Sequence, residues 1–489
     1  MNGWAGLIGT FLPFVVLIAA AWGPLRARQL WFLSLGAHAL SLGCLALLLA
    51  GFYTKAVPES GRISAPLMMA IEPWAGNVSL TWSYQSVLLA LAAALVIFCF
   101  HFLARTRLEG SRSTLAGMAG YLGCLLGALG ADHLFLFTLF FAGSLVPRFV
   151  FAGVGSREKG IDAVKETSFL DIAALFSMMI CVLVFTGPFQ KESRDWFQLS
   201  NASYVALPGA LGFGLLLFAA ALAAGIFPFH GNTRKAYELD SLERAVPLAL
   251  RPLFGFSLLF HFSVVLFSKE FRAFSPYLLG LFSFGLVGCA LGFMGSKAGR
   301  DRIFWLQQAM NCLVAIGFFT MNAKGWHGAN VLLFFMSLSI PYLLIVLTCQ
   351  ERRAKPLPIS RLSQYPVFAL STVSAALFGL FLPVSLGFYG VLLVAWAMVG
   401  EASWLLPFVI ASVPLIAFAG IKIMFFQLDA EGPAEETDDG AAPFRDLSLE
   451  EVMALLPLGA LLLILGLVPK VVLGPLGVSA AALLRGMGY

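Results

Sequence analysis

Residues Gly225–Phe256, "GIFPFHGNTRKAYELDSLERAVPLALRPLFGF", leave an apolar run, turn polar between Gly231 and Arg244, and return to an apolar run. Pro228 lacks the backbone N–H that a helix needs, so it interrupts a helix that contains it. Within a membrane, the backbone groups freed by such a break are tolerated only beside protein or water. The stretch therefore predicts a broken membrane helix if the rest of the chain is embedded in a bilayer.

Composition places the chain among integral membrane proteins. Of its 489 residues, 60% are hydrophobic and only 12% are charged. A soluble domain of this composition could not hide its apolar residues in one core. The net charge of +5 is spread over the connections between apolar runs and forms no basic patch for nucleic acid. The expected partner of the apolar residues is the lipid bilayer.

Apolar runs long enough to cross a bilayer recur along the whole chain. A spanning helix needs about 20 mostly apolar residues, and about 14 such runs are present. They lie near residues 4–22, 30–52, 82–104, 114–131, 134–154, 167–187, 207–229, 245–268, 276–295, 303–322, 327–349, 366–399, 405–426 and 449–474. The twelfth is too long for one straight helix, and Pro383 with Gly387 indicates a break within it. The sequence thus predicts an all-α integral membrane protein that is broken in its seventh and twelfth spans.

Basic residues in the loops predict the orientation. If the amino terminus lies outside, most loop Lys and Arg residues fall on the inner side. They include Arg105, Arg107, Arg112, Arg157, Lys159, Lys297, Arg300, Arg302, Arg352, Arg353 and Lys355. The positive-inside rule then puts both termini on the outer face.

The sequence carries no motif for a cofactor. It has no GxGxxG in strand context, no phosphate loop, no zinc-ligand spacing and no nucleophile elbow. Its seven cysteines all fall in apolar runs and form no CxxC pair, so we interpret them as packing residues. We therefore expect no catalytic residue, no metal site and no cofactor bound by this chain. The acidic segment 427–448 is interpreted as a solvated inner loop, with a docking surface as the alternative.

Three stretches resemble a known family. Breaks in two spans five apart are typical of transporters built from repeats, although two unrelated proline kinks are an alternative. The stretches are "LFLFTLFFAGSLVPRF" (Leu134–Phe149), "FPFH" (Phe227–His230) and "DLSLEEVMALLPLGALLLILGLVPK" (Asp446–Lys470). They are similar to the antiporter-like membrane subunits of respiratory complex I and of Mrp-type cation/proton antiporters. The last stretch resembles the M type of bacterial NADH-quinone oxidoreductase, the counterpart of mitochondrial subunit 4.

The resemblance implies an architecture and a setting. It implies two inverted five-helix repeats within a bacterial inner-membrane complex that uses NADH and quinone, with other membrane subunits as partners. This chain would itself hold no redox centre. The expected segments are 1–113 (three helices), 114–268 (first repeat), 276–426 (second repeat), 427–448 (acidic loop) and 449–489 (last helix and tail).

The charged positions of the family are largely lost in this sequence. Members carry a glutamate in the fifth span, lysines in the seventh and eighth, and a lysine or glutamate in the twelfth. The corresponding residues here are Ala142, Ala223 and Val391, whereas Arg251 lies near the lysine of the eighth span. Protons cross hydrocarbon on ionisable groups, and an arginine is a poor relay because its pKa is too high to release a proton.

Two interpretations of the remaining arginines stay open. Arg251 and Arg148 lie near the inner ends of their spans and could snorkel to the surface. Alternatively, one or both pair with Asp171 or Glu166 as an ion pair inside the bundle.

Histidines and the break itself supply the other candidates. His230 and His261 join Arg251 as candidates for a proton path, because His230 matches the Pro-x-His of the family and His261 lies deeper in the eighth span. Around the break, Ala223 and Phe227 offer a water chain few polar partners, which predicts a bent but dry helix.

Two classes of function follow. The first is a proton-conducting subunit of an energy-converting complex. The second is a structural subunit that has kept the fold and lost its own channel. An Mrp-type antiporter component or a membrane-bound hydrogenase subunit is a further alternative.

Overall fold

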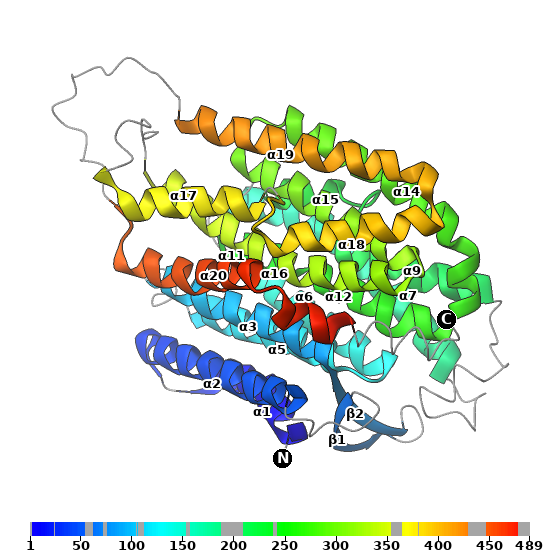
Figure 1. Ribbon diagram of the computed structural model, residues 1–489. Helices are drawn as coiled ribbons and strands as arrows, with labels where there is room; N and C mark the ends of the chain where they lie inside the picture. The colour runs from blue at the N-terminus through cyan, green and yellow to red at the C-terminus, as the bar shows by residue number, and fades with distance from the viewer. Residues whose placement is uncertain are drawn as a thin grey trace.

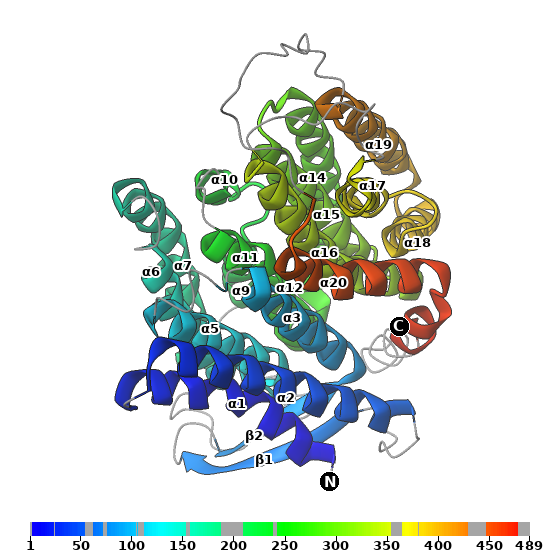
Figure 2. The same ribbon diagram turned by 90° about the vertical axis from the view of Figure 1, so that its left-hand side faces the viewer.

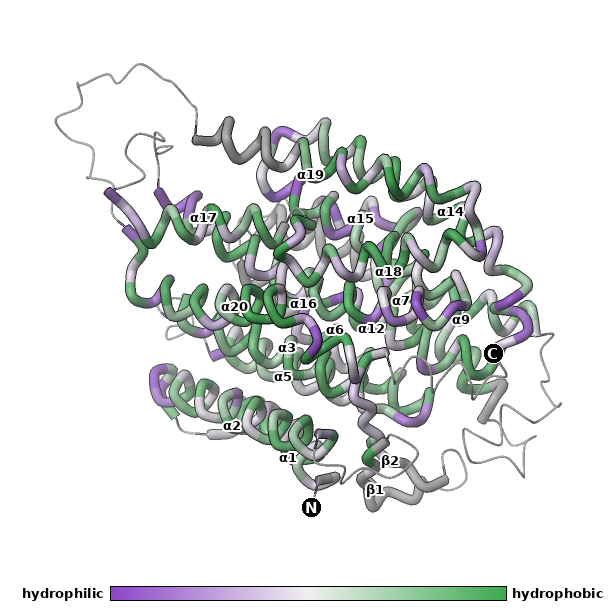
Figure 3. Tube along the Cα trace, in the orientation of Figure 1, coloured by the Kyte–Doolittle hydropathy of each residue, from purple (hydrophilic) through white to green (hydrophobic). Residues whose placement is uncertain are grey.

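The computed structural model is a bundle of long helices with one β-hairpin at its edge (Figure 1). It describes residues 2–23, 25–53, 62–71, 76–103, 105, 112–152, 157–186, 209–237, 242–353, 364–379, 381–428 and 446–477. Among these residues, eight helices are long and apolar enough to cross a membrane. Figure 3 shows hydrophobic residues along most of the helices and hydrophilic residues mainly toward their ends. The prediction of a helical, multi-pass membrane protein is confirmed.

The amino-terminal segment lies along one side of the bundle. It consists of α1 (Asn2–Trp22), α2 (Ala27–Tyr53), the hairpin β1 (Arg62–Ile71) and β2 (Gly76–Ser83), and α3 (Tyr84–Leu103). Helices α1 and α2 pair with each other and pack on α5 and α3, as the views in Figures 1 and 2 agree.

The hairpin corrects the all-α prediction. Its strands are antiparallel, with Arg62 opposite Ser83 and Ile71 opposite Gly76. In β2 the side chains alternate, as a strand requires: Leu80 and Trp82 are buried, whereas Thr81 donates a hydrogen bond to Asp132. This alternation directly precedes the apolar run of α3, so the sequence analysis missed it.

The middle of the chain supplies the first group of central helices. They are α5 (Arg112–Gly130), α6 (Leu134–Ala152), α7 (Arg157–Thr186), α9 (Gly209–Ala224), α10 (Gly231–Tyr237), α11 (Leu242–Leu250), α12 (Pro252–Leu258), a π-helical turn η1 (Leu259–Ser263) and α13 (Val264–Leu266).

The remaining helices complete the bundle around α16. They are α14 (Ser268–Gly295), α15 (Gly299–Phe319), α16 (Ala323–Glu351), α17 (Pro366–Gly379), α18 (Leu386–Glu401), a 3-10 turn (Ser403–Leu405), α19 (Leu406–Leu428) and α20 (Leu449–Leu467). Helix α16 is mostly buried and packs on α3, α11, α15, α17, α18 and α20. Of the acidic segment 427–448, residues 429–445 lie outside the described residues.

Helix breaks occur in both spans in which the sequence predicts them. In the seventh, α9 ends at Ala224, and Gly225 adopts a positive φ of 64° before the chain enters α10. Glycine suits this position because it has no Cβ to clash in the left-handed region. In the twelfth, α17 ends at Gly379 and α18 begins at Leu386. The eighth span is interrupted too, at Arg251, because Pro252 cannot continue the hydrogen-bond pattern of α11.

Candidate functional site

The breaks of the seventh and eighth spans lie against each other. Helix α12 packs directly on α9. At Gly255 the two backbones approach so closely that a Cβ would overlap the Ala220 carbonyl and Ala224. This contact brings Arg251, at the junction of α11 and α12, to the carboxyl end of α9.

Arg251 caps the broken end of α9. Its Nε donates to the Ala223 carbonyl at 2.9 Å, and its Nη2 donates to the Leu222 carbonyl at 2.6 Å. These carbonyls lie in the last turn of α9, where a helix leaves its carbonyls unpaired. A cation is also favoured at this end of a helix by the backbone dipoles. The guanidinium therefore bonds the Ala223 carbonyl at the break and shares the Leu222 carbonyl with the Gly225 N–H.

The same arginine belongs to a buried charge cluster, which we call the arginine triad: Arg148, Asp171 and Arg251. Arg251 Nη2 lies 2.6 Å from Asp171 Oδ1, and Arg148 Nη1 lies 2.8 Å from Asp171 Oδ2. The side chains of Arg251 and Asp171 are 1% and 4% exposed, and that of Arg148 is 14% exposed. Arg148 also lies near the rings of Tyr121 and Phe254, at 5.8 and 5.9 Å from their centroids.

The triad decides between the two interpretations of Arg251. Because the side chain is buried and bonded to Asp171, it does not snorkel to the membrane surface. Of the four residues considered for an ion pair, the structure brings Arg148, Asp171 and Arg251 together. The side chain of Glu166 lies outside the described residues.

Helix α10 follows the break and is bonded to Arg251 and to α15. The sequence analysis did not predict these polar contacts. Thr233 Oγ1 lies 3.4 Å from Arg251 Nη1. Arg234 forms two hydrogen bonds with Asp301 of α15, at 2.7 and 2.9 Å. Tyr237 donates to Gln307 of α15, whose Nε2 in turn donates to the Ala249 carbonyl at 3.0 Å. The polar residues in "LQQAMN" (Leu306–Asn311) stand within an apolar run, and they could have indicated that α15 has a polar face.

The candidate histidines have different surroundings. His230 stacks among aromatic rings, with its centroid 5.5 Å from Phe227 and 5.4 Å from Trp305. His261 lies on the π-helical turn η1, with Nε2 3.4 Å from the Ser86 hydroxyl. The sequence placed His261 deep in the eighth span, and the structure gives it a neutral hydroxyl neighbour from α3.

The three positions where the family carries charges are apolar here. Ala142 is partly buried on α6, and Ala223 is buried at the end of α9. Val391 is buried on α18, where Gly387 and Gly390 let this helix approach α16. A Cβ on Gly387 would lie 2.5 Å from the ring of Phe335. The start of α18, directly after the break that contains Pro383, therefore packs against an aromatic side chain.

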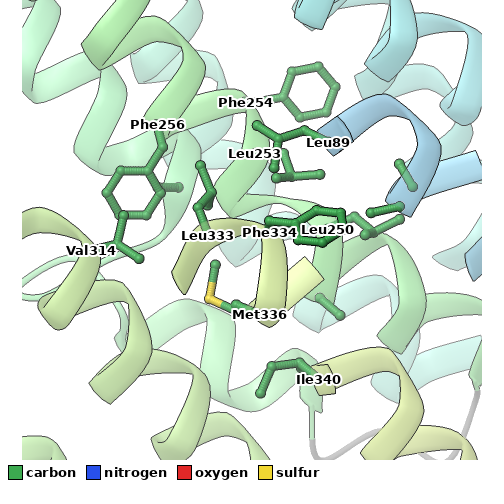
Figure 4. Close-up of a cluster of buried hydrophobic side chains, with 14 of the residues drawn as sticks. Leu89, Leu250, Leu253, Phe254, Phe256, Val314, Leu333, Phe334, Met336 and Ile340 are labelled. Carbon is green, nitrogen blue, oxygen red and sulfur yellow. The ribbon is translucent and has the colours of Figure 1, made fainter. Parts of the chain in front are cut away.

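An apolar layer lies between the broken helices and α16. Figure 4 shows Phe256 of α12 next to Val314 of α15, with Leu333 of α16 beside them. These side chains belong to one buried cluster with Leu89, Leu250, Leu253, Phe254, Phe334, Met336 and Ile340. The side chains of this layer offer water no polar partner. Among the described residues, no group of three or more His, Cys, Asp or Glu could hold a metal ion.

Comparisons with known proteins support the resemblance noted in the sequence. No family model matches the chain. Subunit M of NADH-quinone oxidoreductase from Rickettsia conorii is 24% identical over 380 residues, which cover 74% of this chain and 76% of that protein. Chain 4 of NADH-ubiquinone oxidoreductase from Arabidopsis thaliana is 23% identical over 363 residues, covering 72% and 71% of the two chains.

Solved structures share the fold. A chain of respiratory complex I from Thermus thermophilus matches with a TM-score of 0.80 and 21% identity, covering 99% of this chain and all of that one. A chain of the Mrp complex from Dietzia sp. also matches with a TM-score of 0.80, at 18% identity and with 99% and 97% coverage. The similarity inferred from three sequence stretches is thus confirmed by relatives that cover 74% of the chain, and the shared fold extends over 99% of it.

Proposed function

We propose that this protein is an M-like membrane subunit of a respiratory NADH-quinone oxidoreductase or a related energy-converting complex. In that complex it takes part in proton translocation coupled to electron transfer. The proposal is supported by relatives named subunit M and by a shared fold over 99% of the chain. NADH and quinone would react in other subunits. Its partners are other membrane subunits, since the matching structures are chains of multi-subunit complexes.

The finer architecture is part of the proposal. It has about 14 spans, with inverted repeats at 114–268 and 276–426, and both termini on the outer face of a bacterial inner membrane. The breaks after α9 and α17 support the repeats, because they recur five spans apart. A reporter fused after Arg353 is expected in the cytoplasm, and one fused after Tyr489 outside. A cytoplasmic carboxy terminus would contradict the span count or the orientation.

The proton path of this subunit is closed at Arg251. One observation carries this conclusion: a single guanidinium binds Asp171 and the carbonyls of Leu222 and Ala223. An arginine keeps its proton throughout any physiological cycle, because the guanidinium is a very weak acid. The charge is therefore fixed in place, and it holds the break together instead of passing protons through it.

The test is proton stoichiometry in the complete complex. Sealed vesicles with wild type, Arg251→Ala or His261→Ala would be compared at equal assembled protein, measuring protons moved per electron pair. We expect the same ratio for all three, and Arg251→Lys as the matched control should also leave it unchanged. A lower ratio for Arg251→Ala or His261→Ala with assembly intact would show that a proton path survives in this subunit.

A component of an Mrp-type antiporter is the second candidate. The observation that favours it is the Dietzia structure, which matches as well as the complex I chain by TM-score. Extraction in mild detergent separates the two candidates. Recovery with quinone-reducing and iron–sulfur subunits supports the first function, and recovery with cation-antiport subunits supports the second.

A further inference from the structure

Two buried amides on α15 have polar atoms without a hydrogen-bond partner among the described residues. They are Asn311, through both Nδ2 and Oδ1, and Gln308, through Oε1. Asn311 is fully buried and Gln308 is 1% exposed. Buried polar groups in native proteins are almost always bonded to protein or to ordered water, because an unpaired group destabilises the fold.

The contacts of neighbouring residues locate the two amides. On the same face of α15 as Asn311, Gln307 bonds to the Ala249 carbonyl of α11, and Phe318 packs on Phe256 of α12. Residues three and four apart share a helix face, so Asn311 lies between these contacts and faces α11 and α12.

Gln308 lies toward the turn that follows α9. Cys312, one helical turn further on, lies against Gly285 of α14 together with Phe227 of that turn. A Cβ on Gly285 would be 3.3 Å from Cys312 Sγ and 2.8 Å from the Phe227 ring. The two amides therefore lie on the face of α15 that is turned toward the helix break.

We propose that Gln308 and Asn311 hold ordered water beside the α9 break. The free atoms are one donor and two acceptors, all uncharged, which suits water because it both donates and accepts. An ion would meet no neutralising charge from either amide. The nearby cation Arg251 is already bonded to Asp171 and to two carbonyls.

This site changes the expectation of a dry break in one respect. Apolar residues at the break, such as Ala223 and Phe227, offer water few partners, and the two amides of α15 are further polar groups beside them. Val314, one turn beyond Asn311, belongs to the apolar layer of Figure 4. The proposal rests on packing alone and holds whichever complex the protein belongs to.

Electron cryomicroscopy of the intact complex tests the proposal, at a resolution where ordered water is visible. We expect a density peak about 2.7–3.2 Å from a side-chain atom of Asn311 and from Gln308 Oε1. In Asn311→Leu the peak should disappear while the helices stay in place. In the control Asn330→Leu the peak should remain, because that amide accepts directly from Gln85 at 2.6 Å.

The wild-type map decides the question even if Asn311→Leu fails to assemble. A map that shows other buried waters but no peak here would overturn the proposal. So would a map in which both amides bond only to protein groups. Neither result would bear on proton stoichiometry, so this proposal and the proposed function fail separately.

Discussion

The breaks in the seventh and twelfth spans are stabilised by different interactions. After α9, the carbonyls of Leu222 and Ala223 bond to a guanidinium that comes from another span. Before α18, Ser385 caps its own helix by accepting from the Phe388 N–H at 3.3 Å. There Gly387 packs against the ring of Phe335.

This difference shows that the first break, unlike the second, depends on charged residues far away in the sequence. The first is held by charges on α6, α7 and the α11–α12 junction, so one substitution there disturbs several helices. The second is held by a local cap and apolar packing, which tolerate substitution better because each contact contributes less. Effects on stability should therefore be larger at the first break.

Asp171→Ala should have the largest effect. It leaves two buried arginines without their shared carboxylate, and removing one partner of a buried ion pair costs about 3–5 kcal/mol. The measurement is the melting temperature and the assembled fraction in detergent. Arg148→Ala is the comparison: it leaves Asp171 paired with Arg251, so it should cost less. Equal stability of wild type and Asp171→Ala would mean that the triad does not stabilise the first break.

Arg251→Ala should come next, at about 2–3 kcal/mol, since it frees the buried Ala223 carbonyl while Asp171 keeps Arg148. The Leu222 carbonyl would still accept from the Gly225 N–H. Arg251→Lys should recover part of this loss, because an ammonium keeps the charge but lacks the planar fork. Arg234→Ala is the matched control, as its side chain is 44% exposed and its pair with Asp301 is partly screened. A loss no larger than that of Arg234→Ala would refute the capping role of Arg251.

The sequence predicted both breaks because proline and glycine act locally on the backbone. It revealed the resemblance to a known family because each of the three motifs is an unbroken stretch of sequence. It left the partner of Arg251 open, since the pairing depends on Asp171 of α7 meeting the α11–α12 junction in three dimensions. Pro252 could have revealed the break in the eighth span, but its apolar neighbours suggested a continuous helix. The arginine cap also escaped prediction, because no sequence pattern marks a freed carbonyl.

At the second break, Gly387→Ala should cost about 1–3 kcal/mol by overpacking. The added methyl would lie 2.5 Å from the Phe335 ring, so the ring or α18 must move. The measurement is again the melting temperature, and Gly400→Ala serves as the control because a Cβ there meets nothing within 4 Å. If Phe335→Leu restores the stability of Gly387→Ala, the clash is located at that ring. Without such rescue, the close packing of α18 on α16 would have another origin.

Ser385→Ala should have the smallest effect, about 1 kcal/mol, which is typical for the loss of an N-cap. The hydroxyl accepts from Phe388 N, so alanine leaves that N–H only its bond to the backbone carbonyl of residue 385 at the start of α18. Ser412→Ala is the matched control: its hydroxyl donates to the Phe408 carbonyl within α19 and caps nothing. If both variants lose the same stability, the cap contributes nothing and packing alone holds the second break. If Ser385→Ala instead costs as much stability as Arg251→Ala, the two breaks do not differ as proposed. The break before α18 would then depend on a single side chain as strongly as the break after α9 does.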